Sequence, residues 1–389
     1  MASKLRTALR CSGMTAIVAF ISGFAAVAQA GTFVYVSNQD DSDISVYSMA
    51  PETGLLSPGP RAPAAKLVMP MASSPDGRFL YAAIRTKPYS IFNYRIDGDT
   101  GELRWVGTSP MPESMVNVTV DRSGRWLLAA SYGGDALSVS AIGPDGRVAG
   151  EPSQFFQTGG IKPHSIRVDL DNRFAYVPHL GGDELRVYRF DASAGKLTPA
   201  SPSSVKVKVG TGPRHFIISN DNRFIYLLGE LTGVVTVFVR DVVTGGIEQI
   251  QTIDSVPPNS GLAPIGQPRA PAGTPGAVPF DESVAIWAAD IQITPSGRFL
   301  FTTERTHSTI SSFEVDARNG QLRYIGSVPT EKQPRGIGVD PRGRYLVASG
   351  EKSPNLSVYA IEANTGALTL KQQVPAGSGA NWVQFVETK

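Results

Sequence analysis

The chain has 389 residues, of which 41% are hydrophobic and 18% are charged. This composition excludes a disordered chain, a collagen and a membrane protein with many spans. A formal net charge of +2 gives no electrostatic reason to expect nucleic acid binding. The 40 glycines and 29 prolines, with few helix-like runs between them, favour a turn-rich all-β protein.

The first thirty residues have the three-part pattern of a secretory signal peptide. Residues 4–10 (KLRTALR) form a basic start, residues 14–27 are apolar, and Ala28 and Ala30 supply the small side chains of a cleavage site. The apolar stretch is shorter than the ~20 residues of a membrane-spanning helix. We therefore expect cleavage near Ala30 and export to the periplasm or beyond, with an uncleaved anchor as the alternative. Cleavage would also remove Cys11, the only cysteine, and with it any disulfide or cysteine metal site.

The rest of the chain repeats one motif. Six segments share the pattern of SPDGRFLYAA, with a marker arginine at Arg78, Arg125, Arg173, Arg223, Arg298 and Arg344. A second, independent marker is a turn glycine at Gly54, Gly101, Gly146, Gly195, Gly245, Gly320 and Gly366. Both markers advance by about 45–50 residues, and both share one longer step of 75. Because the two markers keep the same steps, including the long one, we interpret them as one repeating structural unit.

Each unit is predicted to hold four short strands. Around Arg223 these are residues 215–219, 223–228, 234–240 and 247–253, separated by turns of the Asp-Asn and Thr-Gly type. Four-stranded units of this length are the blades of a propeller. The sequence thus predicts an all-β, seven-bladed β-propeller with antiparallel blades, which forms a single domain over residues 31–389.

The seventh blade is split between the two ends of the chain. Residues 32–37 (TFVYVS) match the second strand of the other units, and the missing first strand matches residues 381–386 (NWVQFV). Pairing of the N- and C-terminal strands would close the ring and protect its sheet edges. The one long step contains a Pro/Gly-rich insertion at about 257–280, which is either a tolerated surface loop or a lid over a site.

Functional residues are expected where equivalent positions differ between blades. The start of the innermost strand is such a position, occupied by Met69, Val116, His164, Arg214, Ala289, Arg335 and Asn381. The end of the second strand is another, occupied by Gln39, Arg85, Tyr132, Leu180, Glu230, Arg305 and Glu351. Since these strands are antiparallel neighbours, both rings surround the same mouth of the central channel. His164, Arg214, Glu230, Arg305 and Arg335 fall on four consecutive blades and can converge on one sector.

The chemistry of these five residues fits an anionic substrate that is hydrolysed. Arginine binds carboxylate or phosphate through paired hydrogen bonds and can stabilise an oxyanion. His164 or Glu230 could act as general base on a water molecule. The alternative for each residue is a structural one, a polar group that caps a strand or lines a wet channel.

Other polar residues are weaker candidates. His179 lies one position before the second ring and either lines the site or packs within a blade, whereas Asp290 either faces the channel or pairs with an arginine. His215 is expected to point between blades, and His307 to lie in a solvated loop. We find no G-x-S-x-G, H-E-x-x-H or phosphate-loop motif. With four histidines in the chain, we expect neither a metal nor a cofactor.

Several segments resemble the seven-bladed propeller lactonase family, which includes propeller-type 6-phosphogluconolactonases and carboxymuconate cyclases. The similarity covers essentially all of residues 31–389. It is strongest in GTGPRHFIIS (210–219), LLGEL (227–231), WAADIQITPSGRFLF (287–301), ERT (304–306) and QPRGIGVDPRGRYLVASGEKS (333–353), with KPHSIRVDLDNR (162–173) matching the histidine segment.

The resemblance implies a lactonase that opens the ring ester of a sugar lactone. It places the active residues at His164, Arg214, Glu230 and Arg305, with Arg335 as a substrate-binding residue; His179 and Asp290 are further substrate-binding candidates. The expected ligand is a small anionic lactone, and the expected state is a monomer or weak dimer without membrane insertion after cleavage. Two alternatives stay open: a muconate-type cycloisomerase on the same site, and a non-catalytic exported propeller that binds a ligand or protein.

Overall fold

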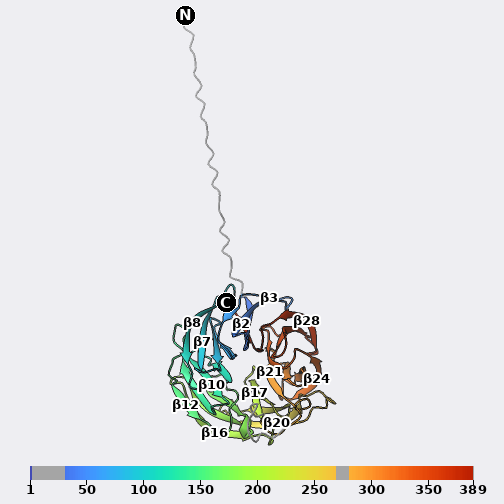
Figure 1. Cartoon of the computed structure of the whole chain (residues 1–389). Coiled ribbons are helices and arrows are strands. Elements are labelled where there is room, and N and C mark those ends of the chain that lie inside the picture. The colour runs from blue at the N-terminus through green and yellow to red at the C-terminus, as the bar shows by residue number, and fades with distance from the viewer. Residues whose placement is uncertain (2–30, 269–279, 389) are drawn as a thin grey trace.

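The computed structural model describes residue 1, residues 31–268 and residues 280–388. Within these ranges the strands form seven antiparallel sheets, arranged as blades around a central axis (Figure 1). The predicted seven-bladed β-propeller is therefore confirmed. The N-terminal segment of the predicted signal peptide, residues 2–30, lies outside the described residues. No helix in the described part of the chain is long and apolar enough to cross a membrane.

The blades follow one another in chain order, each written here from its innermost to its outermost strand. Blade 1 is β29 (Ala380–Glu387), β1 (Thr32–Asn38), β2 (Asp43–Met49) and β3 (Leu56–Pro58), with β4 (Ala62–Pro63) also paired to β2; blade 2 is β5 (Val68–Ser73), β6 (Phe79–Ile84), β7 (Ser90–Ile96) and β8 (Leu103–Pro110); blade 3 is β9 (Asn117–Val120), β10 (Trp126–Ser131), β11 (Ala136–Ala141) and β12 (Gln154–Gln157).

The other four blades have the same plan. Blade 4 is β13 (Arg167–Val168), β14 (Phe174–His179), β15 (Glu184–Asp191) and β16 (Lys196–Lys206), with a short 3₁₀ turn η1 (Leu180–Gly182), and blade 5 is β17 (Pro213–Ile218), β18 (Phe224–Gly229), β19 (Val234–Arg240) and β20 (Ile247–Asp254). Blade 6 is β21 (Ala288–Ile293), β22 (Phe299–Glu304), β23 (Thr309–Val315) and β24 (Leu322–Pro329). Blade 7 is β25 (Pro334–Val339), β26 (Tyr345–Gly350), β27 (Asn355–Ile361) and β28 (Leu368–Pro375).

Blade 1 closes the ring as the sequence predicts. β29 pairs antiparallel with β1, from Thr32 opposite Glu387 to Ser37 opposite Trp382. The Thr388 amide then donates to the Gly31 carbonyl at 3.0 Å. In Figure 1 the C-terminus lies beside the first strands, between blades 2 and 7. The backbone groups on the inner side of β1 are thus paired, as those of the second strand are in the other blades.

Both sequence markers act at the contacts between blades. Each turn glycine has a positive φ and lies against an aromatic ring of the preceding blade. In six blades this ring directly follows the marker arginine, and in blade 1 the equivalent ring is Phe33. The pairs are Gly54–Tyr345, Gly101–Phe33, Gly146–Phe79, Gly195–Trp126, Gly245–Phe174, Gly320–Phe224 and Gly366–Phe299. Five of the six marker arginines donate to a backbone carbonyl of the next blade, as Arg223 does to Ala317 at 2.7 Å. The interpretation of these arginines as blade architecture is confirmed for those five.

The innermost strands of five blades carry a β-bulge or a register shift near their start. In blade 5, Pro213 pairs with Gly229 but the next partners are Phe216 and Leu227, so β17 holds one extra residue. Shifts occur at the equivalent places in β5, β21, β25 and β29. A bulge interrupts the alternation of side chains and can direct two successive residues toward the same space.

The bulge explains why the expectation for His215 is wrong. Strict alternation after Arg214 places His215 between blades, whereas its ring reaches Trp382 of blade 1 at 5.7 Å between ring centroids. Blade 1 is not a neighbour of blade 5, so this contact lies across the central channel.

Candidate active site

A buried ion pair occupies the mouth of the channel where inner strands begin and second strands end. Arg214, at the start of β17, donates from Nε to Oε2 of Glu230 at 2.6 Å. Glu230 directly follows β18, so the antiparallel pairing of the two strands brings the residues together. Arg214 is 1% exposed and also donates to the Ala289 carbonyl of blade 6. It therefore ties two blades together at the site.

Arg305 is the second cation on the same carboxylate. Its Nη2 lies 3.1 Å from Oε2 of Glu230, while Nε and Nη2 donate to the carbonyls of Trp287 and Ala288, both at 3.1 Å. The Trp287 ring lies 3.8 Å from Cζ of Arg305, a close cation–π contact. Backbone and ring together hold this guanidinium in one orientation.

The two guanidiniums keep Glu230 ionised. Burial alone would raise the pKa of this carboxyl, but Arg305 and Arg214 outweigh it and lower the pKa below its usual range. Burial also lowers the pKa of Arg305 to about 9. The site therefore carries fixed charges whose hydration has been replaced by protein contacts.

His164 lies next to this pair without being bonded to it. Its Nε2 is 4.0 Å from Oε2 of Glu230, too long for a hydrogen bond, and its Nδ1 has no hydrogen-bond partner. The rings of Tyr132 and His215 pack on it edge-on, at 5.8 and 5.5 Å between centroids. Burial, followed by the charge of Arg214, holds the pKa of His164 well below its usual range. The imidazole is neutral near pH 7 and can accept a proton.

Two further arginines, Arg335 and Arg85, add positive charge to the site. Arg335 pairs with Glu351 at 3.3 Å, and Gln333 donates to the other oxygen of the same carboxylate at 2.7 Å. Arg85, from blade 2, donates to Ser114 at 3.1 Å and has its pKa lowered to about 10 by burial and by the charge of Arg335. Arg85 was not among the selected candidates, although it occupies the same second-ring position as Glu230 and Arg305.

Counting these residues gives the charge of the site. Four arginines face two glutamates, which leaves two positive charges for an incoming anion. A cluster of largely buried arginines with this excess of positive charge is suited to a carboxylate or phosphate.

The two remaining candidates lie elsewhere. Asp290 is one layer deeper in the channel, where it contacts Nδ1 of His215 at 2.9 Å and accepts from the Ile337 amide at 3.1 Å. His179, at the end of β14, is fully buried, and neither ring nitrogen has a hydrogen-bond partner. Its charged neighbours are Arg186 and Glu184 rather than the arginine cluster. The structure does not bring His179 into the group around Glu230.

The insertion lies beside this mouth where it is described. The Ile265 amide contacts the Leu231 carbonyl at 3.4 Å, one residue beyond Glu230, and Ala263 bridges to Ala285. Residues 269–279 are outside the described part of the chain. In the described ranges no group of three or more His, Cys, Asp and Glu side chains is placed to hold a metal ion.

The comparisons with known proteins agree with this geometry. The family model "Lactonase, 7-bladed beta-propeller" matches residues 61–385. A 6-phosphogluconolactonase of Serratia proteamaculans is 35% identical over 91% of this chain and 98% of its own length, and one of Photorhabdus laumondii is 37% identical over 90% and 97%. The chain belongs to the seven-bladed β-propeller lactonase family.

One solved structure is similar to nearly the whole chain. The periplasmic gluconolactonase of Pseudomonas aeruginosa superposes with a TM-score of 0.77 at 25% identity, covering 92% of this chain and 99% of that one.

Proposed function

We propose that this lactonase hydrolyses a sugar lactone that carries an anionic group, with 6-phosphogluconolactone as the reference substrate. One observation carries the proposal: neutral His164 lies 4.0 Å from a carboxylate that two buried arginines hold. This combination offers a proton acceptor and an oxyanion site side by side. The names of the curated relatives support the substrate class.

In the proposed reaction, Arg335 binds the anionic group of the substrate at the mouth, and Arg214 and Arg305 polarise the lactone carbonyl. Water attacks the carbonyl carbon and gives a proton to His164, while the arginines stabilise the oxyanion of the tetrahedral intermediate. The ring C–O bond then breaks, and the departing alkoxide takes the proton back from the imidazolium. One lactone and one water become one hydroxy acid.

His164 is the better candidate for the base because Glu230 is committed to its arginines. A carboxylate stabilised by two guanidiniums is a weak proton acceptor. The low pKa of free His164 is partly an effect of the surrounding arginines, Arg214 first among them. An anionic substrate offsets that positive charge and raises the pKa of the imidazole when it binds.

A lactone panel tests the proposed reaction. Proton release would be followed with gluconolactone, 6-phosphogluconolactone and a muconolactone, using the wild type and the Arg214→Ala variant. Arg318→Ala is the matched control, because this exposed arginine pairs with Asp316 within its own surface turn. We expect turnover above the spontaneous rate that falls by at least ~100-fold in Arg214→Ala and persists in the control. Absence of turnover from the folded wild type on every lactone would reject hydrolysis, and preference for the muconolactone would favour a cycloisomerase-type substrate.

We further propose that the protein acts after export, as residues 31–389. The basic, apolar and small-residue pattern of the first thirty residues supports this location. The structural neighbour described as periplasmic supports it as well. Expression in a bacterium, followed by N-terminal sequencing of the periplasmic fraction, should yield a chain that starts at Gly31. Recovery of the intact chain with Met1 from the cytoplasm alone would contradict export.

A further inference from the structure

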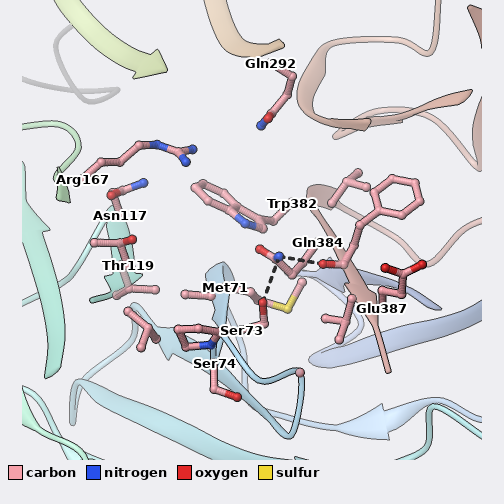
Figure 2. A pocket seen from close by; sticks show the side chains of 18 of the residues that line it. Met71, Ser73, Ser74, Asn117, Thr119, Arg167, Gln292, Trp382, Gln384 and Glu387 are labelled. Atoms are coloured by element: carbon pink, nitrogen blue, oxygen red, sulfur yellow. Dashed lines mark hydrogen bonds between the residues drawn. The ribbon is translucent and has the colours of Figure 1, made fainter. Parts of the chain in front are cut away.

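The central channel has a second mouth, on the face opposite the arginine cluster. The cluster lies where the inner strands begin, whereas residues at the ends of β5, β9, β21 and β29 line a cavity of about 500 Å³. Thr119, Arg167, Gln292, Trp382 and Gln384 are among the lining side chains. Figure 2 shows Arg167, Gln292 and Trp382 reaching into this space from different sides.

The same comparison of blades that singles out the first mouth also singles out this one. The residues three positions after the first ring are Ala72, Thr119, Arg167, Ile217, Gln292, Gly338 and Gln384. Five of these seven positions line the cavity, and four of those five are polar. Propeller architecture needs no polar side chain here, since Ile217 and Gly338 fill equivalent positions. The blades have diverged at this mouth as they have at the first.

Several of these polar side chains make no hydrogen bond to another described residue. Within the described residues, the Arg167 guanidinium makes no hydrogen bond or ion pair, although it is half-buried. The Gln292 amide and the Trp382 indole nitrogen are also without a hydrogen bond to another described residue. Burial lowers the pKa of Arg167. The Asp290 carboxylate attracts the charge of Arg167 but makes no hydrogen bond to it. The half-buried guanidinium has therefore given up part of its hydration without a compensating hydrogen bond from a described residue.

A layer of side chains separates this cavity from the first mouth. His215 contacts Asp290 at 2.9 Å, and the His215 ring packs on Trp382 from one side and on His164 from the other. Asp290 and Trp382 line the second cavity, whereas Arg214, Glu230 and Arg305 do not. The layer of His215, Asp290 and Trp382 therefore separates the two sites, and no cationic residue belongs to both.

We propose that this second mouth binds a small hydroxycarboxylate, a molecule with one carboxylate and several hydroxyl groups. The Arg167 fork matches a carboxylate, and Arg122 at the rim adds positive charge that offsets the Asp290 and Glu387 carboxylates of the same lining. The amides of Gln292 and Asn117 and the hydroxyl of Thr119 suit hydroxyl groups, and the Trp382 ring offers a flat apolar face to C–H groups. The site is argued from its own residues and does not depend on the proposed reaction.

Calorimetric titration with sodium gluconate tests the site. Because gluconate could also occupy the first mouth, the wild type is compared with Arg167→Met, Arg167→Lys and Arg335→Met. We expect Arg167→Met to weaken gluconate binding by at least tenfold, Arg167→Lys to weaken it less, and Arg335→Met to retain a binding event of wild-type strength. Sorbitol, which lacks the carboxylate, and acetate, which lacks the hydroxyls, should both bind more weakly than gluconate.

Gln292→Ala is a second variant that tests the site in case Arg167→Met misfolds, since the Gln292 side chain makes no hydrogen bond to another described residue. It should weaken gluconate binding while leaving the melting temperature unchanged. The proposal is overturned if the folded wild type does not bind gluconate, or if binding is lost in Arg335→Met and kept in Arg167→Met. No turnover is measured, so failure of the proposed lactone hydrolysis would leave this result unaffected.

Discussion

At the scale of single residues, the site is defined by the difference in bonding between Glu230 and His164. Oε2 of Glu230 accepts from two buried guanidiniums, while the adjacent His164 has no hydrogen bond from Nδ1. A carboxylate held by two guanidiniums beside an imidazole without such bonds is typical of a site in which one group orients charge and the other moves a proton. This division of roles leads to a prediction about pH.

We predict that turnover persists below the ordinary pKa of histidine, about 6.5. Burial and the nearby arginines hold the pKa of His164 well below its usual range, so the base stays unprotonated at pH values where an ordinary histidine is charged. The acid limb of kcat/KM should therefore lie below pH 6.5. Initial rates with a lactone between pH 4.5 and 7.5 would locate it.

The Glu230→Gln variant separates the two candidate bases. Removing the negative charge near His164 makes the imidazolium less favourable and should move the acid limb to still lower pH. If Glu230 were the base, the variant would have no activity at any pH. A wild-type limb above pH 6.5 would contradict the predicted role of His164.

The positions of these residues could be predicted from the sequence, but their environments could not. Divergence between repeats identifies His164, Arg214, Glu230 and Arg305 because the repeat fixes their place in each blade. Arg85 shares that position, yet only the structure reveals that it lies close enough to couple with Arg335. Burial and charge coupling depend on distances between blades, which a repeat pattern does not contain.

At the scale of strands and turns, the contact between each turn glycine and its neighbouring aromatic ring aligns the blades. Gly245 has a φ of 78°, and a Cβ atom there would lie 2.3 Å from Cδ1 of Phe174. The left-handed backbone and the close ring both require glycine. Gly297, in the turn between β21 and β22, has a similar φ of 72° but has nothing within 4 Å of a built Cβ.

These two glycines form a matched pair for a stability test. Gly297→Ala should cost about 1–2 kcal/mol, the strain of a left-handed alanine alone. Gly245→Ala should cost about 2–4 kcal/mol, because overpacking against Phe174 adds to that strain. Urea unfolding of both variants gives the difference. Equal losses would mean that the ring moves aside freely and does not align the blades.

The strands themselves follow closely from the sequence, and the bulges do not. The predicted strands of blade 5 agree with β17–β20 to within two residues, because turn signals and alternation define them. The extra residue at Arg214 and His215 leaves no signal in the alternation of apolar and polar residues. His215, Asp290 and Trp382 were consequently missed as one layer of the channel.

At the scale of the whole molecule, closure of the ring buries polar groups that an open chain would expose to water. His164, His179 and His215 are all buried, and Nδ1 of His164, both ring nitrogens of His179 and Nε2 of His215 have no hydrogen-bond partner. The folded protein therefore holds three imidazoles in surroundings that disfavour their charged form. This property makes stability depend on pH before the carboxylates begin to protonate.

The pH dependence has a definite sign. Burial lowers the pKa of His179 to about 3 and that of His215 to about 4, whereas unfolded histidine titrates near pH 6.5. Below pH 6.5 the unfolded chain binds protons at these histidines that the folded chain does not bind. The free energy of unfolding is therefore highest above pH 6.5 and falls as the pH decreases toward the folded pKa values. Each buried histidine contributes a slope of about 1.4 kcal/mol per pH unit.

We therefore predict that His179→Leu flattens this dependence by about 1.4 kcal/mol per pH unit between pH 6 and 5. Leucine removes an imidazole that makes no hydrogen bond, so the variant should keep its stability at pH 7.5. His307→Leu is the control, because His307 is exposed and stays in water in both states. Urea unfolding at several pH values measures the slope. A slope in His179→Leu equal to that of the wild type would mean that His179 binds a proton in the folded protein, and its burial would not destabilise the charged form.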